Sequence, residues 1–148
     1  MKIIFETKFF QKNKFNEKAI LRYFNSASKS FKIAAQHEEP EIIFKFSYDA
    51  LIKIGITLIA FYGYRIKSRR GHHIKILDKL SQILLNKDIA IIGDKMRKKR
   101  NLDLYEGGII IGTKEAKQYL NFIEKVILKA EEYIKDQKTC SRLIKFEY

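Results

Sequence analysis

The sequence contains few of the residues that interrupt helices or cross-link small folds. It has one proline and seven glycines in 148 residues, and because both residue types are unfavourable inside helices, their scarcity favours long helices. Cys140 is its single cysteine, which excludes an intramolecular disulfide framework. The chain is long enough to bury a core as one domain without disulfides or a structural metal.

Long hydrophobic runs are also lacking. The longest, residues 54–64, is interrupted by Gly55 and Thr57 and is shorter than the roughly 20 residues that a bilayer-spanning helix needs. Near the N-terminus, Glu6 and Lys8 come before any apolar stretch is long enough for a signal peptide. We therefore expect a cytoplasmic protein without a membrane partner.

Signatures of metal and cofactor chemistry are missing as well. No Cys/His spacing resembles a zinc site, and the sequence has no phosphate-binding glycine loop, no HExxH and no nucleophile elbow. His72 and His73 are adjacent, and neighbouring residues point in different directions on a helix, so a shared metal is not expected. We expect neither a metal site nor a cofactor.

Apolar residues at helical spacing predict the first two helices. The first starts near Glu17, after Asn16 as its N-cap, and ends near Gln36. The second has Pro40 in its first turn. From Ile54 onward it is apolar almost all round, which is typical of a helix at the centre of a bundle.

Three more helices are predicted after a glycine- and arginine-rich connection. A short one includes residues 74–84, a fourth covers about 88–104, and a long amphipathic one follows Thr113 as its N-cap. Short connections between such helices predict an all-α fold. We expect an antiparallel four-helix-type bundle with one extra short helix.

The chain ends carry weaker patterns than the middle. Residues 1–15 form an N-terminal segment and residues 137–148 a C-terminal tail, each either a short strand or a frayed end. The helical bundle is expected to occupy residues 16–136.

Positive charge is the strongest compositional feature. Thirty Lys and Arg against 17 Asp and Glu give a formal charge of +13, which attracts polyanions. The alternative is a composition that simply favours lysine. Two basic clusters lie at expected helix ends or connections, where phosphates are accessible, although such clusters can equally be solvated charged faces. Their candidate nucleic-acid-binding residues are Arg65, Lys67, Arg69, Arg70, His72, His73, Arg97, Lys98 and Lys99.

Several neighbouring residues have two interpretations each. Tyr62 and Tyr64 could stack on bases or pack at the edge of the core. His72 and His73 follow a glycine at the expected start of a helix, where one could contact a phosphate or a catalytic group, or both could serve packing and capping. Asp49 stands on the central helix, and a structural salt bridge is its expected role.

An Arg–Asn pair ends the fourth predicted helix, within residues 96–105. This stretch resembles the motif of HEPN domains, small helical bundles common in prokaryotic toxin–antitoxin and defence systems. That motif has an Arg followed by a polar residue, usually Asn, with a His a few residues on. Arg100 and Asn101 match its first half. Three other segments also resemble the family, at residues 23–27, 48–51 and 71–73. The resemblance therefore spans about residues 16–133.

The resemblance implies a metal-independent endoribonuclease that acts as a homodimer around a shared cleft. In such a site an Arg holds the scissile phosphate and stabilises its developing charge, Asn orients its neighbours, and His transfers protons. In this chain Tyr105 stands where the family has His, and a phenol with a pKa of about 10 is a poor base at neutral pH. Arg100, Asn101 and Tyr105 are thus the candidate catalytic residues.

Three functions remain open from the sequence. The first is an RNA-directed HEPN-like protein, a ribonuclease or a toxin-type effector of a toxin–antitoxin system. The second is a non-catalytic module that binds RNA or a partner protein, such as the nucleotidyltransferase-type antitoxin that the resemblance implies. The third is a helical scaffold. A homodimer is expected from the resemblance and from the eight Tyr and eleven Phe that must be buried.

Overall fold

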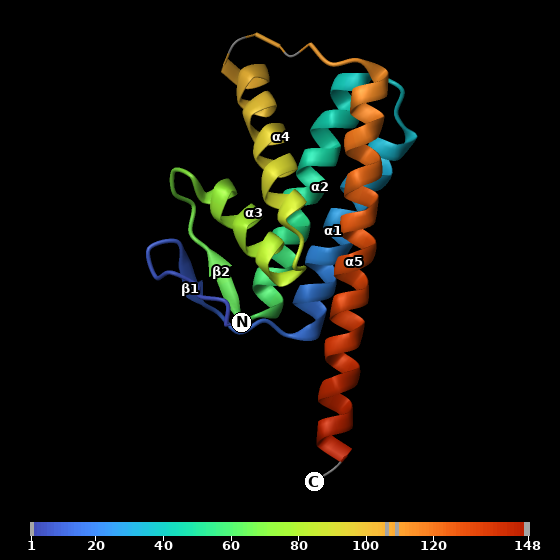
Figure 1. The fold of residues 1–148 in the computed structure, drawn as a ribbon. Coiled ribbons are helices and arrows are strands. Elements are labelled where there is room, and N and C mark those ends of the chain that lie inside the picture. Colours follow the sequence, from blue (N-terminus) through green and yellow to red (C-terminus); the bar gives the residue numbers. More distant parts are fainter. Residues whose placement is uncertain (1, 106, 109, 147–148) are drawn as a thin grey trace.

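The fold is mostly helical, with one small two-stranded sheet (Figure 1). The structure is a computed structural model that describes residues 2–105, 107–108 and 110–146, without the side chains of residues 103–105 and 139–146. Its elements are, in order, β1 (Phe10–Lys12), α1 (Glu17–Gln36), α2 (Pro40–Phe61), β2 (Tyr64–Ile66), α3 (His72–Ile83), α4 (Lys87–Tyr105) and α5 (Thr113–Phe146).

The helix boundaries agree with those expected from the sequence. The side chain of Asn16 accepts a hydrogen bond of 2.8 Å from the backbone N–H of Ala19, as an N-cap does. Pro40 is the first residue of α2, where its missing N–H costs no helical hydrogen bond. The bounds of α3 and α4, and the start of α5 at Thr113, lie within two residues of the predicted ones.

Helix α2 lies at the centre of the molecule and contacts every other helix (Figure 1). From Ser47 onward its side chains are buried or half-buried; Leu51, Ile54 and Leu58, for example, are fully inaccessible. This confirms the prediction of a central apolar helix. Within the described part of the chain, α2 and the other helices all lack the combination of length and hydrophobicity needed to cross a bilayer.

Helix α3 packs on α2 where Gly55 exposes the α2 backbone. A Cβ atom at Gly55 would overlap the Cγ2 atom of Ile76, which is itself fully buried. Tyr48 lies about two turns before Gly55 on the same face of α2, and His73 lies about one turn before Ile76 on the same face of α3. The close packing at Gly55 therefore brings Tyr48 and His73 together.

The small two-stranded sheet is the one described element that departs from an otherwise helical fold, which agrees with the all-α prediction. β1 pairs antiparallel with β2, with Gln11 opposite Arg65. The sequence allowed a strand near the N-terminus but predicted only a connection at β2. A three-residue strand has no periodicity to reveal it. Long-range contacts hold this sheet instead: the amine of Lys79, whose side chain is only 2% exposed, pairs with Glu6 at 2.9 Å and lies against the rings of Phe5 and Phe10.

Helix α5 is longer than the sequence analysis expected. Residues 137–148 were predicted as a tail, either a short strand or a frayed end, whereas the helix continues to Phe146. No proline or glycine follows Gly112, so nothing in the local sequence terminates the helix. Its last turns project beyond the remainder of the molecule (Figure 1).

The packing at Gly55 gives a stability prediction. Gly55→Ala should lower the free energy of unfolding by about 1–3 kcal/mol, because the added methyl group meets a fully buried isoleucine. Without that overlap, a Gly→Ala change inside a helix would stabilise it by about 1 kcal/mol. Gly112→Ala, just before α5, where a Cβ meets no atom within 4 Å, is the control for the same substitution without an overlap. Urea denaturation followed by circular dichroism measures both; a Gly55→Ala variant as stable as the parent would show that the close approach imposes no constraint.

Candidate nucleic-acid interface

The two basic clusters of the sequence converge in space. One contributes residues at the start of α3 and the other contributes residues near the end of α4. Together they line a cavity of about 780 Å³, referred to below as the basic cavity. Its lining residues are Arg69, Arg70, Gly71, His72, His73, Ile74, Arg97, Arg100 and Asn101.

The packing of α3 against α4 explains this convergence. The two helices are joined by a short turn that includes Leu85 and lie in contact with each other, so residues equally far from the turn, such as His73 and Arg97, become neighbours. Gly71 precedes α3 with a φ of +80°, a conformation that most side chains disfavour. It turns the chain so that Arg69 and Arg70, before the helix, line the same cavity as His73 within it.

His73 and Tyr48 form a hydrogen bond at the side of the basic cavity. The phenol oxygen of Tyr48 lies 2.8 Å from Nδ1 of His73, and either atom can be the donor. Burial, with added repulsion from His72, Arg100 and Arg97, lowers the pKa of His73 from 6.5 to about 4. Burial raises the pKa of Tyr48 to about 12. Both groups are therefore uncharged at neutral pH.

The two cavity arginines of α4 have different surroundings. Arg97 donates two hydrogen bonds to Oδ1 of Asp94, of 3.0 and 2.8 Å, and this pairing lowers the pKa of Asp94. Arg100 lies over the ring of Tyr48, with 5.9 Å between Cζ and the ring centroid. No carboxylate lies within ion-pair distance of Arg100 among the side chains that the structure describes. Arg100 is thus positioned by an aromatic face and keeps its charge for a ligand.

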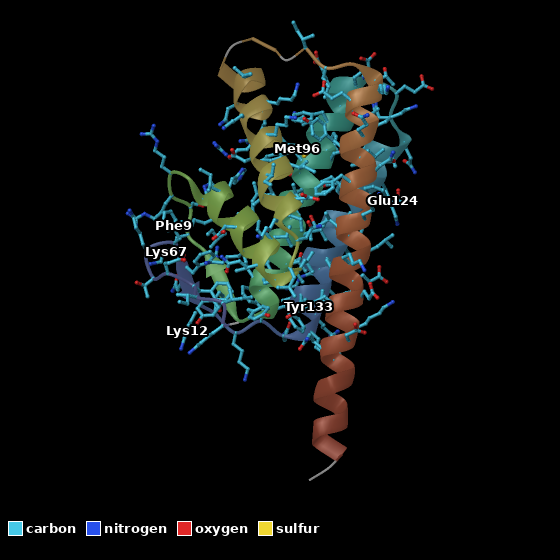
Figure 2. The ribbon with its side chains drawn as sticks, in the orientation of Figure 1. Phe9, Lys12, Lys67, Met96, Glu124 and Tyr133 are labelled. Atoms are coloured by element: carbon cyan, nitrogen blue, oxygen red, sulfur yellow. The ribbon has the colours of Figure 1, made fainter. Side chains whose placement is uncertain are left out.

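Four of the predicted nucleic-acid-binding residues lie away from the basic cavity. Arg65 is on β2, and Lys67 donates a 2.7 Å hydrogen bond from Nζ to the carbonyl of Thr7; Figure 2 shows Lys67 on the side of the molecule that carries the sheet. Lys98 is exposed and pairs with Asp94. Lys99 pairs with Glu115 of α5 at 2.9 Å. The side chain of the predicted catalytic residue Tyr105 lies outside the described residues.

The contacts of His72, Tyr62 and Tyr64 distinguish between the two interpretations that the sequence left open for each. Nδ1 of His72 lies 2.7 Å from the carbonyl oxygen of Arg69, a contact that fits a local role at the start of α3. The hydroxyls of Tyr62 and Tyr133 are 2.6 Å apart, and Tyr64 stacks on Phe5 with ring centroids 4.2 Å apart. These tyrosines therefore pack at the edge of the core.

No metal centre accompanies these residues in the described part of the chain. Its His, Cys, Asp and Glu residues form no group of three or more that could hold a metal ion.

A second cavity adjoins the basic cavity and was not predicted from the sequence. It has a volume of about 390 Å³ and is referred to below as the α2 cavity. Its lining residues are Lys45, Phe46, Tyr48, Asp49, Ile52, His73 and Arg100, so it shares His73 and Arg100 with the basic cavity. Two sequence signals lie at this position: the resemblance of residues 48–51 to a HEPN segment, and the charged residue Asp49 on the central helix.

Asp49 forms the salt bridge expected from the sequence. Its Oδ2 atom lies 3.0 Å from Nζ of Lys53 and accepts a 2.6 Å hydrogen bond from the buried hydroxyl of Ser30. Nζ of Lys53 also donates to Ser30. This network ties α1 to α2 and fixes the carboxylate at the wall of the α2 cavity.

Comparison of the chain with protein-family models, curated proteins and solved structures finds no match. The chemistry of the site must therefore be inferred from its geometry. Arginines around an uncharged histidine suit an anionic ligand, because guanidinium groups bind phosphates through paired hydrogen bonds.

The depressed pKa of His73 gives a pH prediction. Between about pH 6.5 and pH 4 the unfolded chain binds a proton at this residue that the folded chain does not. The free energy of unfolding should therefore fall as the pH is lowered through this window, and His73→Gln should remove part of that slope. His37→Gln, which changes a histidine at the end of α1, is the control. Urea titrations at pH 4.5, 5.5 and 7 measure the slopes; equal slopes for His73→Gln and the parent would contradict the shift.

Proposed function

We propose that this protein is a HEPN-type RNA-directed protein that binds the RNA backbone in the basic cavity and cleaves it without a metal ion. The observation that carries the proposal is the convergence of Arg100 and Asn101 with Arg69, Arg70 and His73 around one cavity. In this proposal α1, α2, α4 and α5 are the four bundle helices and α3 is the extra short one.

Charge and geometry support RNA backbone binding. The formal charge of +13 attracts a polyanion over long distances, and basic contacts to phosphates supply most of the sequence-independent affinity for nucleic acids. Arg100 lines the basic cavity and lies over the ring of Tyr48. It can offer its guanidinium N–H groups to two oxygens of one phosphate.

His73 can take the role that the missing family histidine would have. When Nδ1 carries the ring proton, it donates a hydrogen bond to the Tyr48 oxygen, and Nε2 then presents a lone pair. Nε2 then accepts the proton of a ribose 2′-hydroxyl, whose oxygen attacks the adjacent phosphorus. The bond to the 5′-oxygen breaks, that oxygen takes a proton from water, and a 2′,3′-cyclic phosphate remains. Arg100 stabilises the negative charge that develops on the phosphoryl oxygens.

A bound phosphate would adapt the acidity of His73 to this role. A pKa of about 4 makes the imidazole a weak base in the free protein. A phosphate beside the ring favours the charged form and raises the pKa towards neutrality, where proton transfer is most efficient.

The alternative is a non-catalytic HEPN module that binds RNA or a partner protein, such as a nucleotidyltransferase-type antitoxin. The low pKa of His73 in the free protein favours it, as does Tyr105 at the position of the family histidine. Under either proposal we expect a homodimer, as the HEPN resemblance implies, and a cytoplasmic location, as the sequence analysis predicted.

Cleavage of end-labelled single-stranded RNA in EDTA tests the proposal. The parent should cleave, and Arg100→Ala and His73→Ala should each reduce the rate by about 100-fold or more, because they remove charge stabilisation and the base. Lys98→Ala removes a cation of the same cluster that lies outside the cavity, and it should change the rate little. Thermal melts confirm that each variant is folded.

The same samples separate the alternatives. RNA binding without cleavage, weakened by Arg100→Ala and by added salt, would identify the non-catalytic module. Neither binding nor cleavage by the parent would overturn the RNA proposal and leave a scaffold.

A further inference from the structure

The α2 cavity lies where the nucleoside attached to a bound phosphate would reach. It shares His73 and Arg100 with the basic cavity, so a phosphate held by Arg100 stands at its entrance. Its volume of about 390 Å³ falls in the range of about 300–1,000 Å³ typical of small-molecule sites. The cavity therefore has the position and the size for a nucleobase.

The walls of the α2 cavity suit a flat aromatic ligand. Phe46 is half-buried, Ile52 is 7% exposed, and both line the cavity beside the ring of Tyr48. Unstacked RNA bases are commonly held against aromatic rings or against the plane of an arginine. The guanidinium of Arg100, which already lies over Tyr48, can supply the second kind of surface.

One polar group in the wall is fixed and has an oxygen to offer. Ser30 and Lys53 both interact with Oδ2 of Asp49. Among the described residues no hydrogen bond or ion pair uses Oδ1. An ionised carboxylate is an acceptor only, so Oδ1 can be satisfied by N–H donors on a ligand. The salt bridge thus orients Asp49 through Oδ2 and leaves Oδ1 able to accept a hydrogen bond from a base.

The chemistry of the base edges decides which base fits. Guanine has two adjacent donors, the N1–H and the 2-amino group, and both can approach one acceptor atom, here Oδ1 of Asp49. The amino groups of adenine and cytosine stand beside a ring nitrogen that is an acceptor. The N–H of uracil lies between two carbonyl oxygens, which a carboxylate repels. A cationic amine, Lys45, also lines the cavity and can approach the O6 atom of guanine.

We propose that the α2 cavity is a guanine-binding subsite, in which Asp49 reads the N1–H and 2-amino group of the nucleotide next to the phosphate held by Arg100. This inference rests on the proposed RNA-directed function. It adds a base preference to that function and assigns Asp49 as the residue that determines it.

Fluorescence anisotropy with short labelled oligonucleotides tests the subsite. The probes are oligoadenylates with one variable central base, and every nucleotide carries a 2′-fluoro group in place of the 2′-hydroxyl, so no position can be cleaved. The parent should bind the guanine probe about tenfold more tightly than the adenine, cytosine or uracil probes. A hypoxanthine probe lacks the 2-amino group and should fall between guanine and adenine. This order tests the proposal without any substitution.

Asp49→Asn then tests the assignment. Its amide oxygen can still accept from Ser30 and Lys53, while the amide nitrogen presents a donor to the cavity. The guanine preference should disappear while affinity for the adenine probe is kept. Glu124→Gln makes the same change in charge on α5, on the side of the molecule away from α3 (Figure 2). Glu124→Gln therefore measures how much RNA affinity rises when one negative charge is lost, and it should keep the guanine preference.

The outcomes distinguish the two proposals. Equal affinity of the parent for all probes, or a guanine preference that survives in Asp49→Asn, would overturn the guanine subsite and leave RNA binding intact. Failure of the parent to bind any probe would overturn the proposed function itself.

Discussion

The close contact between α2 and α3 at Gly55 is the constraint on which the site depends. With no side chain at that position, Ile76 lies directly on the α2 backbone. On the same faces of α2 and α3, Tyr48 and His73 form a hydrogen bond. Helix α4, which bears Arg100, packs against α3. The position of α3 therefore determines where Arg100 lies relative to Tyr48 and His73.

The electrostatics of the site couple proton binding to anion binding. Burial and the nearby arginines keep His73 uncharged, and the same arginines leave the empty cavity with an excess of positive charge. An anion removes part of the cause of the pKa depression. By thermodynamic linkage the protonated form of His73 then binds that anion more tightly. In the proposed function, a bound phosphate would therefore shift the pKa of His73 back towards its ordinary value.

The sequence predicted the parts of the fold that local patterns determine. The N-cap Asn16, Pro40 in the first turn of α2 and the apolar stripes predicted the bounds of α1, α3 and α4 and the starts of α2 and α5 to within two residues. The strand Tyr64–Ile66 depends on contacts with the N-terminal segment, and such long-range contacts cannot be predicted from a local sequence pattern. The length of α5 was underestimated because the apolar stripe weakens after Ile134, although nothing there stops a helix.

The site was predictable only in part, for the same reason. Arg100 and Asn101 form a local motif, and the basic clusters are visible as runs of charge. The convergence of these residues, the positions of Lys98 and Lys99 outside the basic cavity, and the contacts of Tyr48 all depend on how α2, α3 and α4 pack. Tyr105 remains a prediction.

The central claim is that RNA phosphate binds beside His73, between Arg69 and Arg70, which precede α3, and the arginines of α4. A crystal structure of the protein with a short RNA that carries one 2′-deoxynucleotide tests it most directly. The claim predicts a phosphate with oxygens in hydrogen-bond contact with Arg100 and with His73 beside it. RNA that instead follows Arg65 and Lys67 along the sheet, leaving the basic cavity without a phosphate, would contradict it.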